Sequence, residues 1–426
     1  MSRAPRYHGV MPTHAPTHAD LFRVFGGIGL LSFGGPTAQI ALMHRELVER
    51  RDWLDEDGFL RALSFCMLLP GPEAMQLATY AGWRLRGVPG GLIAGGLFVL
   101  PGAVLILALA ASYAQWGAMP VAQALFLGIK ATVVVVVLQA LARLGTRALR
   151  GPGRWVAAGL SFLAIFALGL PFPLIIATAA AWGYATASGA PLPNTQPLRE
   201  PPTTLATIAV WGGLWLLPIA ALWALSAELL VRIALFFSKL ALLTFGGAYA
   251  VLAWMAQDVV TAKGWLGPEQ MIDALGLAET TPGPLILVTE FVGYLAAEQA
   301  GGWALGVAGA AVTLWVTFIP CFLWIFAGAP YIDRLAGFPR LSAALDMIIA
   351  AVVGVILNLS LWFAAHVAFG EVGRVEAGPF RLIAPHWASF DFHAALLAAF
   401  AALLLLVLRW PLPLVLVLAG AAGLLV

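Results

Sequence analysis

The sequence predicts an all-α polytopic membrane protein made of two inverted helical repeats with broken helices. Of the 426 residues, 61% are hydrophobic and only 10% are charged, whereas a water-soluble chain carries about 25% charged residues. Apolar stretches of roughly 18 residues or more recur along the chain, and a helix of that length crosses a bilayer. Two helix-breaking motifs interrupt such stretches in the first half, and both recur in the second half.

The first motif is Ser-Phe-Gly-Gly-Pro, and the second is Leu-Pro-Gly-Pro-Glu, which ends at Glu73. Both return 212 residues later, as Thr-Phe-Gly-Gly and as Thr-Pro-Gly-Pro. A doubled pair of helix breaks at membrane depth is typical of secondary transporters. The substrate-binding residues predicted in these four motifs are Ser32, Phe33, Gly34, Gly35, Pro36, Pro70, Gly71, Pro72, Thr244, Gly246, Gly247, Thr281, Pro282, Gly283 and Pro284.

About thirteen apolar membrane segments follow one another along the chain. They lie at 20–42, 58–82, 88–112, 120–142, 153–169, 172–188, 204–225, 230–255, 267–297, 301–327, 341–366, 391–408 and 411–426. Some of them are alternatively half-helices or re-entrant hairpins. The predicted division is a cytosolic tail over 1–19, a first membrane repeat over 20–188, a linker with an extra transmembrane helix over 189–229, and a second membrane repeat over 230–426.

Loop charges predict a cytosolic N-terminus and a periplasmic C-terminus. With this orientation the inside loops carry most of the Lys and Arg, whereas the outside loops at 113–120, 170–172 and 298–301 carry none, as the positive-inside rule requires. Arg45, Arg50 and Arg51 do not fit, which leaves open a first segment that re-enters. Seven crossings separate equivalent points of the repeats, so the second repeat is inverted and the substrate site is expected near the midplane.

The four breaks predict an anion-binding site. Unpaired backbone groups cost several kcal/mol in hydrocarbon, so each break must face protein, water or a ligand. Gly34 and Gly35 permit positive φ, and Pro36 and Pro72 suit the first turn of a new helix. A helix that begins there directs free N–H groups and about half a positive charge at one point. For any single break, the alternative interpretation is a packing kink.

Ionisable residues inside apolar segments are the next candidates, because burying one costs at least about 2.5 kcal/mol. Lys130 and Lys239 are predicted to bind substrate, with snorkelling or an internal ion pair as the alternative. Glu73, Glu279 and Glu290 are predicted to couple protons, and Glu73 alternatively complements a helix dipole. The three glutamates are not repeat equivalents, which suits a coupling group on one side of a shared site.

Several other residues receive structural assignments. Arg61, Asp273 and Asp346 lie near segment ends, where an interfacial role is expected. Cys66 and Cys321 fall within apolar segments and are expected to be small buried hydrophobes. The Gly-x-x-x-Gly pairs Gly91/Gly95 and Gly302/Gly306 are expected to pack helices within the chain, with a homodimer seam as the alternative.

Other functional classes lack their motifs. The chain contains neither a nucleotide-binding Gly-x-x-x-x-Gly-Lys-Ser/Thr nor a zinc-binding His-Glu-x-x-His. No Gly-x-Ser-x-Gly nucleophile has an obvious histidine partner. No basic patch is interleaved with aromatic residues, so nucleic acid is not an expected partner. We therefore expect a protein that is not an enzyme, that needs no cofactor or metal, and that lies in membrane lipid.

The motifs resemble those of the chromate ion transporter family in its long, two-domain form. The matching strings are Leu-Leu-Ser-Phe-Gly-Gly-Pro (30–36), Ala-Gln-Ile (38–40), Arg-Asp-Trp-Leu (51–54), Leu-Pro-Gly-Pro-Glu-Ala-Met-Gln-Leu-Ala-Thr-Tyr (69–80), Gly-Trp (82–83) and Thr-Phe-Gly-Gly-Ala-Tyr-Ala-Val-Leu (244–252). The resemblance extends over both halves, to about residue 370, and the combination of strings is specific.

The resemblance implies export of chromate across the bacterial inner membrane, with chromate resistance as the result. It also implies sulfate as a competing analogue and the proton-motive force as the energy source, as in an antiporter. The alternatives are a sulfate or oxyanion importer that uses the same site, and a membrane scaffold that transports nothing. Of the ionisable candidates, only Glu73 lies in a matching string.

Overall fold

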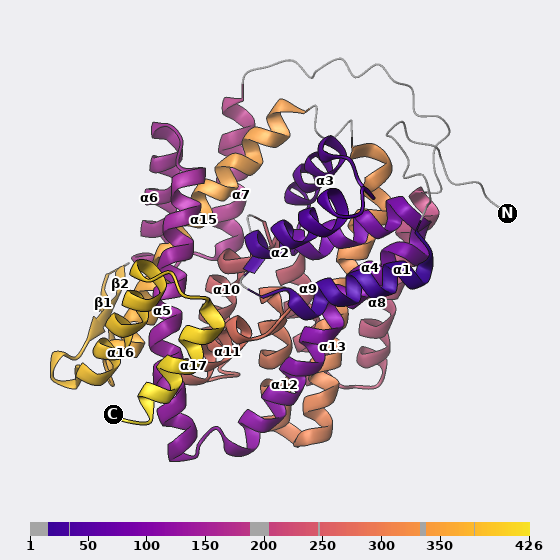
Figure 1. Ribbon diagram of the computed structural model, residues 1–426. Coiled ribbons are helices and arrows are strands. Elements are labelled where there is room, and N and C mark those ends of the chain that lie inside the picture. Colours follow the sequence, from indigo (N-terminus) through magenta and orange to yellow (C-terminus); the bar gives the residue numbers. More distant parts are fainter. Residues whose placement is uncertain (1–15, 34, 188–203, 246–247, 333–337, 379) are drawn as a thin grey trace. The chain divides into compact units, whose positions relative to one another are not determined.

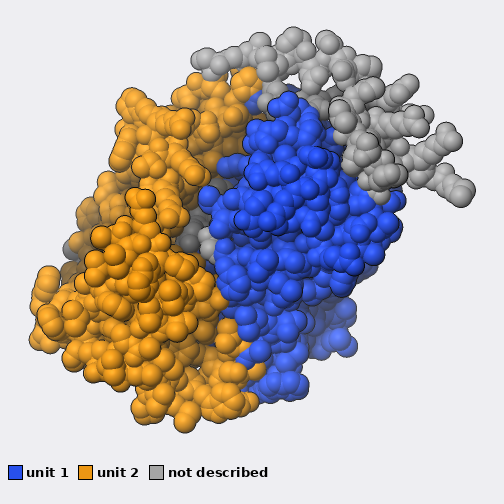
Figure 2. Space-filling view, in the orientation of Figure 1, with its two compact units in different colours: residues 1–108, 190–247, 281–338 blue, residues 109–189, 248–280, 339–426 orange. Residues whose placement is uncertain are grey.

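The computed structural model describes residues 16–33, 35–187, 204–245, 248–332, 338–378 and 380–426. Helices form most of this part of the chain (Figure 1). It divides into two compact units, which Figure 2 distinguishes by colour. The first unit takes residues 1–108, 190–247 and 281–338, and the second takes 109–189, 248–280 and 339–426. Each unit therefore combines segments from both halves of the sequence.

The first unit contains all four helix breaks. Its α4 begins at Glu73 and has non-helical φ and ψ at Arg86 and Gly87, so it consists of two consecutive helices. The last residues of α4 belong to the second unit. The elements of the first unit are α1 (His18–Leu31), α2 (Gly35–His44), a π-helical turn (Arg45–Glu49), α3 (Glu56–Leu68), α4 (Glu73–Trp116), α8 (Thr204–Ala224), α9 (Glu228–Leu243), a 3-10 turn (Leu285–Leu287), α12 (Val288–Gly301), α13 (Trp303–Gly328) and a second 3-10 turn (Ala329–Tyr331).

Within the described residues, the second unit contains the one departure from an all-α fold, an antiparallel hairpin in which Val372 pairs with Pro385. The hairpin lies between two predicted membrane segments, where hydrophobic periodicity gives no helix signal. The elements of this unit are α5 (Pro120–Ala148), α6 (Pro152–Phe166), α7 (Phe172–Thr186), α10 (Ala248–Gln257), a π-helical turn (Asp258–Ala262), α11 (Pro268–Thr280), α15 (Pro339–Ala368), β1 (Val372–Ala377), β2 (Phe380–Pro385), a 3-10 turn (Trp387–Ser389), α16 (Phe392–Ala402), a π-helical turn (Leu403–Val407) and α17 (Leu412–Gly423).

Helix lengths show a multi-pass membrane protein. Among the described residues, five helical stretches are long and apolar enough to cross a bilayer: Glu73–Trp116, Pro120–Ala148, Thr204–Ala224, Trp303–Tyr331 and Pro339–Ala368. Four of the thirteen predicted segments are each two helices joined at a break: 20–42, 58–82, 230–255 and 267–297. The first of these pieces, α1, has 14 residues and is about 21 Å long, which is less than the ~30 Å hydrocarbon core.

Local structure recurs at equivalent points of the two repeats. A π-helical turn follows α2 at Arg45–Glu49, and another follows α10 at Asp258–Ala262. After each turn, the backbone N–H of a tryptophan donates to a carbonyl oxygen of the turn. Trp53 donates to the Leu47 oxygen at 2.8 Å, and Trp265 donates to the Val259 oxygen at 3.0 Å. The same backbone pattern has therefore formed twice from sequences that differ at most positions.

Small residues bring helices together inside the first unit. A Cβ on Gly91 would lie 2.6 Å from the ring of Phe326, and one on Gly95 would lie 2.8 Å from the ring of Phe322. Both phenylalanines belong to α13, so the prediction that Gly91 and Gly95 pack helices within the chain is confirmed. Cys66 and Cys321 are free and buried, which confirms their assignment as small buried hydrophobes.

Candidate functional site

The first break of each repeat ends a helix in the same way. The Ser32 hydroxyl donates to the Ile28 carbonyl oxygen at 2.6 Å at the end of α1. The Thr244 hydroxyl donates to the Leu240 carbonyl oxygen at 2.7 Å at the end of α9. Such back-bonding gives the last turn an alternative to continuing the helix. Both side chains are 1% exposed, so each break is buried in protein.

New helices begin directly after these breaks. Gly35 has φ +78° and is the first residue of α2, as the sequence predicts for a residue that permits positive φ. Pro36 follows in the first turn and is half-buried, like Phe33. Gly34, Gly246 and Gly247 lie outside the described residues, and α10 begins at Ala248.

The second break of each repeat turns at a glycine. Gly71 has φ +124° and Gly283 has φ +94°, a region that residues with a Cβ avoid. After Pro72 the helix α4 starts at once, whereas Pro284 leads into the 3-10 turn Leu285–Leu287 before α12. The remaining motif residues are buried, apart from the half-buried Pro70: Pro72, Thr281, Pro282 and Pro284.

The four breaks are joined in two reciprocal pairs. The N–H of Gly71 donates to the Thr244 carbonyl oxygen at 2.8 Å, and the N–H of Gly283 donates to the Ser32 carbonyl oxygen at 2.9 Å. The second break of each repeat is thus bonded to the first break of the other. Reciprocal contacts of this kind are the mark of a two-fold relation. Because all four breaks belong to the first unit, they form one structural feature, which we call the crossed breaks.

The crossed breaks alter the expected donor set. The sequence predicts that N–H groups at the breaks are available to an anion, but those of Gly71 and Gly283 are donated to the protein itself. What remains are the N–H groups in the first turns of the helices that start at the breaks, which have no intrahelical acceptor. An anion held here must use those groups or side chains.

Two buried glutamines that the sequence analysis did not select support the crossed breaks. Gln39 Nε2 donates to the Gly283 oxygen at 2.7 Å and to the Ser32 oxygen at 3.3 Å. Gln76 Nε2 donates to the Pro70 oxygen at 2.7 Å. They are 1% and 0% exposed, and no described group donates to either Oε1. Their position inside two motif strings was the signal that could have identified them.

The predicted acids occupy different environments. Glu73 is half-buried in the first turn of α4. Glu290 is 1% exposed in the first turn of α12, and no described group donates to its Oε2. Glu279 is 7% exposed at the end of α11 in the second unit. Lys239 is exposed on α9, as the snorkelling alternative expects.

Lys130 forms an internal ion pair in the second unit. Its Nζ lies 3.3 Å from Asp273 Oδ1 and 3.9 Å from Glu269 Oε2. The Tyr113 hydroxyl donates to Asp273 Oδ2 at 2.7 Å. Asp273 is 0% exposed, so the prediction of an interfacial role is wrong for it. A position near a segment end tells only how far along the helix a residue lies, not which face of the helix it is on. Asp273 lies on the face of α11 that is covered by protein.

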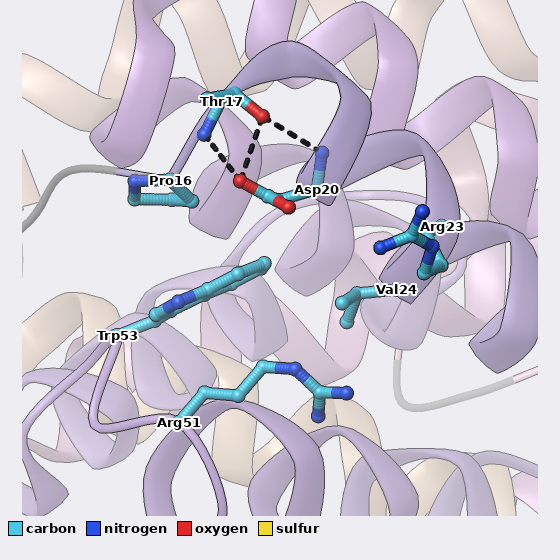
Figure 3. A pocket seen from close by; sticks show the side chains of 7 residues that line it. All are labelled: Pro16, Thr17, Asp20, Arg23, Val24, Arg51 and Trp53. Carbon is cyan, nitrogen blue, oxygen red and sulfur yellow. Dashed lines mark hydrogen bonds between the residues drawn. The ribbon is translucent and has the colours of Figure 1, made fainter.

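A separate pocket of about 520 Å³ opens in the first unit beside the start of α1. Figure 3 shows the hydrogen bonds between Thr17 and Asp20, with Arg23, Arg51 and Trp53 around the same pocket. The Arg51 guanidinium lies 5.9 Å from the Trp53 ring and also pairs with Glu46. None of the residues of the four helix-breaking motifs lines this pocket, so it is distinct from the crossed breaks.

Comparison with known proteins gives a consistent result. The family model for chromate transporters matches residues 19–184 and again residues 231–424. Proteins named chromate transport protein from Cupriavidus metallidurans and Pseudomonas aeruginosa are 31% and 34% identical over 80% of this chain, and the matches cover 82% and 79% of those relatives. A probable chromate transport protein of Synechococcus elongatus is 31% identical over 79% of this chain and 82% of that relative. No solved structure matches the chain significantly. The double match over most of the sequence, with the helix breaks at the matching motifs, places this chain in the chromate transporter family, which is a family of transporters rather than enzymes.

Proposed function

We propose that this protein is a secondary active transporter that exports chromate from the cytoplasm across the bacterial inner membrane. The observation that carries the proposal is the reciprocal bonding of four helix breaks in one unit. Broken helices paired between two repeats are what a midplane substrate site requires. Support for chromate as the substrate comes from the family and from the names of the three relatives.

At the crossed breaks, the groups that bind the anion would be backbone N–H groups and side chains. Ser32 and Thr244 have their hydroxyls bonded within their own helices, so they shape the break rather than donate to the substrate. The first-turn N–H groups of α2 and α4, the helices that start directly at a break, are the donors that suit a tetrahedral oxyanion. Sulfate has the same shape and charge as chromate, so it is the expected competitor.

The membrane potential favours export. Moving one charge across 100 mV is worth about 2.3 kcal/mol, so a dianion leaving a negative interior gains about 4.6 kcal/mol. Export therefore needs no energy source other than the membrane potential. A coupled proton would change the free energy available for each anion exported. Glu73, Glu279 and Glu290 are the acids proposed for such coupling. With the N-terminus cytosolic and the repeats inverted, the crossed breaks would face each side of the membrane alternately.

Transport by the purified full chain in liposomes tests the proposal. We expect saturable flux of radiolabelled chromate, competition by sulfate, and acceleration by a potential that is negative on the chromate side. A scaffold without transport activity would show no saturable flux. Net inward flux of sulfate in intact cells at physiological potential would favour the importer. Imposing a pH gradient with the potential clamped at zero then shows whether a proton is coupled, and in which direction.

A further inference from the structure

We propose that Lys130 binds the transported oxyanion, that Asp273 occupies this lysine in its absence, and that a proton travels with each anion in the same direction. The inference rests on the proposed function and adds a residue, Asp273, and a direction of coupling. It differs from the proton antiport that the sequence resemblance implies.

The geometry is that of a cation held by a displaceable carboxylate. Lys130 Nζ lies 3.3 Å from Asp273 Oδ1 and is 9% exposed. The Tyr113 hydroxyl holds the other oxygen, Oδ2, at 2.7 Å. A carboxylate presents to Lys130 the same kind of charged oxygen that an oxyanion would present. Asp273 therefore occupies the position of the substrate on this lysine.

The charged groups around Asp273 can be enumerated. On α11 itself lie Glu269, which is 75% exposed and 3.9 Å from Lys130, and Glu279, which is 7% exposed at the end of the helix. Of the helices packed on α11, α5 contributes Lys130 and, more than three turns further along, Arg143 and Arg147, and α17 contains no ionisable residue. The ionisable side chains of α15 contact other partners. Arg340 lies over the Tyr184 ring, Asp346 pairs with the Arg154 guanidinium, and the His366 ring contacts the Trp362 carbonyl oxygen. Lys130 is thus the one cation that pairs with Asp273 among the described residues.

A purely structural role accounts poorly for this cluster. A buried ion pair is weak evidence of stability, because desolvation of both charges offsets their attraction. Ionisable groups inside membrane segments usually mark a substrate or proton pathway. The cluster joins residues of both repeats, but it has no symmetric counterpart, since Arg61 stands at the position equivalent to Asp273 and is exposed. A structural pair that the repeated fold itself required would be expected to occur twice.

Charge balance links the anion to a proton. When the oxyanion takes Lys130, the Asp273 carboxylate is left buried without its counter-ion, which is strongly unfavourable. A proton taken up from the loading side neutralises this carboxylate, and Tyr113 can still hydrogen-bond to it. Linkage then makes anion and proton bind cooperatively, each increasing the affinity for the other. On release the anion departs, Asp273 loses its proton on the far side, and Lys130 pairs with it again.

The test measures protons and anions together in proteoliposomes that contain the full chain. Sulfate serves as the probe beside chromate, because sulfate carries no proton of its own near neutral pH. We expect one proton to move with each sulfate in the wild-type protein. Asp273→Asn should retain anion flux but lose the accompanying proton and the pH dependence of the flux. Lys130→Gln should weaken anion affinity at least tenfold.

The matched control is Asp346→Asn, which removes the acid of an ion pair on α6 and α15 in the same unit. It should leave the proton count unchanged. If Asp273→Asn does not fold, proton uptake on adding sulfate to the detergent-solubilised wild type replaces it, with Lys130→Gln as the comparison. Wild-type flux with no proton, or with a proton moving against the anion, overturns this inference and leaves the proposed function standing. Absence of saturable flux in the wild type overturns the proposed function itself.

Discussion

The backbone N–H of Gly71 donates to the carbonyl oxygen of Thr244 over 2.8 Å. This bond joins the second helix break of one repeat to the first helix break of the other. Its counterpart, from Gly283 to Ser32, repeats the relation in the opposite sense. A substitution that moves one break must therefore disturb two helices from different halves of the chain.

Gly71→Val should abolish chromate transport while leaving membrane insertion intact. Gly71 has φ +124°, and a Cβ there would lie 2.8 Å from Gln76 Nε2 and 2.9 Å from Cys321 Sγ. Left-handed backbone costs roughly 1–2 kcal/mol for residues with a Cβ, and the contacts add to that. Gly96→Val is the matched control, since a Cβ on Gly96 has no described atom within 4 Å. Measured by liposome flux and membrane fractionation, normal transport by Gly71→Val would exclude a functional role for this break.

Gln39→Leu should lower both thermal stability and transport. The substitution leaves the carbonyl oxygens of Ser32 and Gly283 without the amide that now bonds to both. An unsatisfied buried polar group costs about 1–3 kcal/mol. Because Ser32 and Gly283 belong to two different breaks, this loss of stability would weaken the contact between them. Gln123→Leu, which removes a half-buried amide bonded to the Gly117 oxygen in the second unit, is the comparison. Equal unfolding temperatures and fluxes in the two variants would contradict a special role for Gln39.

Glu73→Gln should tighten chromate binding by at least tenfold without loss of fold. Glu73 is the acid in the first turn of α4, directly after the Pro-Gly-Pro break, so its negative charge would repel a dianion bound there. A unit charge about 10 Å from a dianion contributes roughly 3 kcal/mol at an effective dielectric constant near 20. Glu228→Gln is the control, because Glu228 also lies in a helix first turn but is exposed and follows no break. Unchanged or weaker competitive binding by Glu73→Gln would place the substrate elsewhere.

His44 should make stability depend on pH. Its Nε2 lies 2.7 Å from Glu56 Oε2 and its Nδ1 lies 3.1 Å from Glu49 Oε1. The hydrogen bond that the imidazole donates to the Glu56 carboxylate is the main cause that raises the pKa of His44, with Glu49 adding to it. Because the folded pKa is raised, this stabilisation is complete below the unfolded pKa of about 6.5 and is lost as the pH rises through the folded pKa. His44→Gln should reduce the fall in unfolding temperature between about pH 6 and pH 9; an identical fall in both proteins would contradict this.

Local sequence chemistry predicted where helices break, but not what the breaks touch. Positive φ at Gly35 and the start of α4 after Pro72 follow from residue type. The bonding of Gly71 to Thr244 does not, because pairing between distant breaks is decided by tertiary packing. Asp273 was misplaced for the same reason, since distance from a segment end reveals nothing about which face of α11 is covered. The two glutamines lie in the motif strings, and only the fold shows that both amides are buried.

Our proposal that the second repeat is inverted predicts that equivalent positions react from opposite sides of the membrane. Arg50 and Lys263 follow the two equivalent π-helical turns, and both are exposed. Single cysteines at these positions, in a chain whose buried Cys66 and Cys321 are replaced by alanine, should label with an impermeant maleimide from opposite faces. With a cytosolic N-terminus and full crossing of the first segment, Arg50→Cys labels from the periplasm and Lys263→Cys from the cytoplasm. If the first segment re-enters instead, both assignments reverse, yet the two sites remain on opposite sides. Labelling of both from one side would show that the repeats run parallel and would overturn the proposed inverted arrangement.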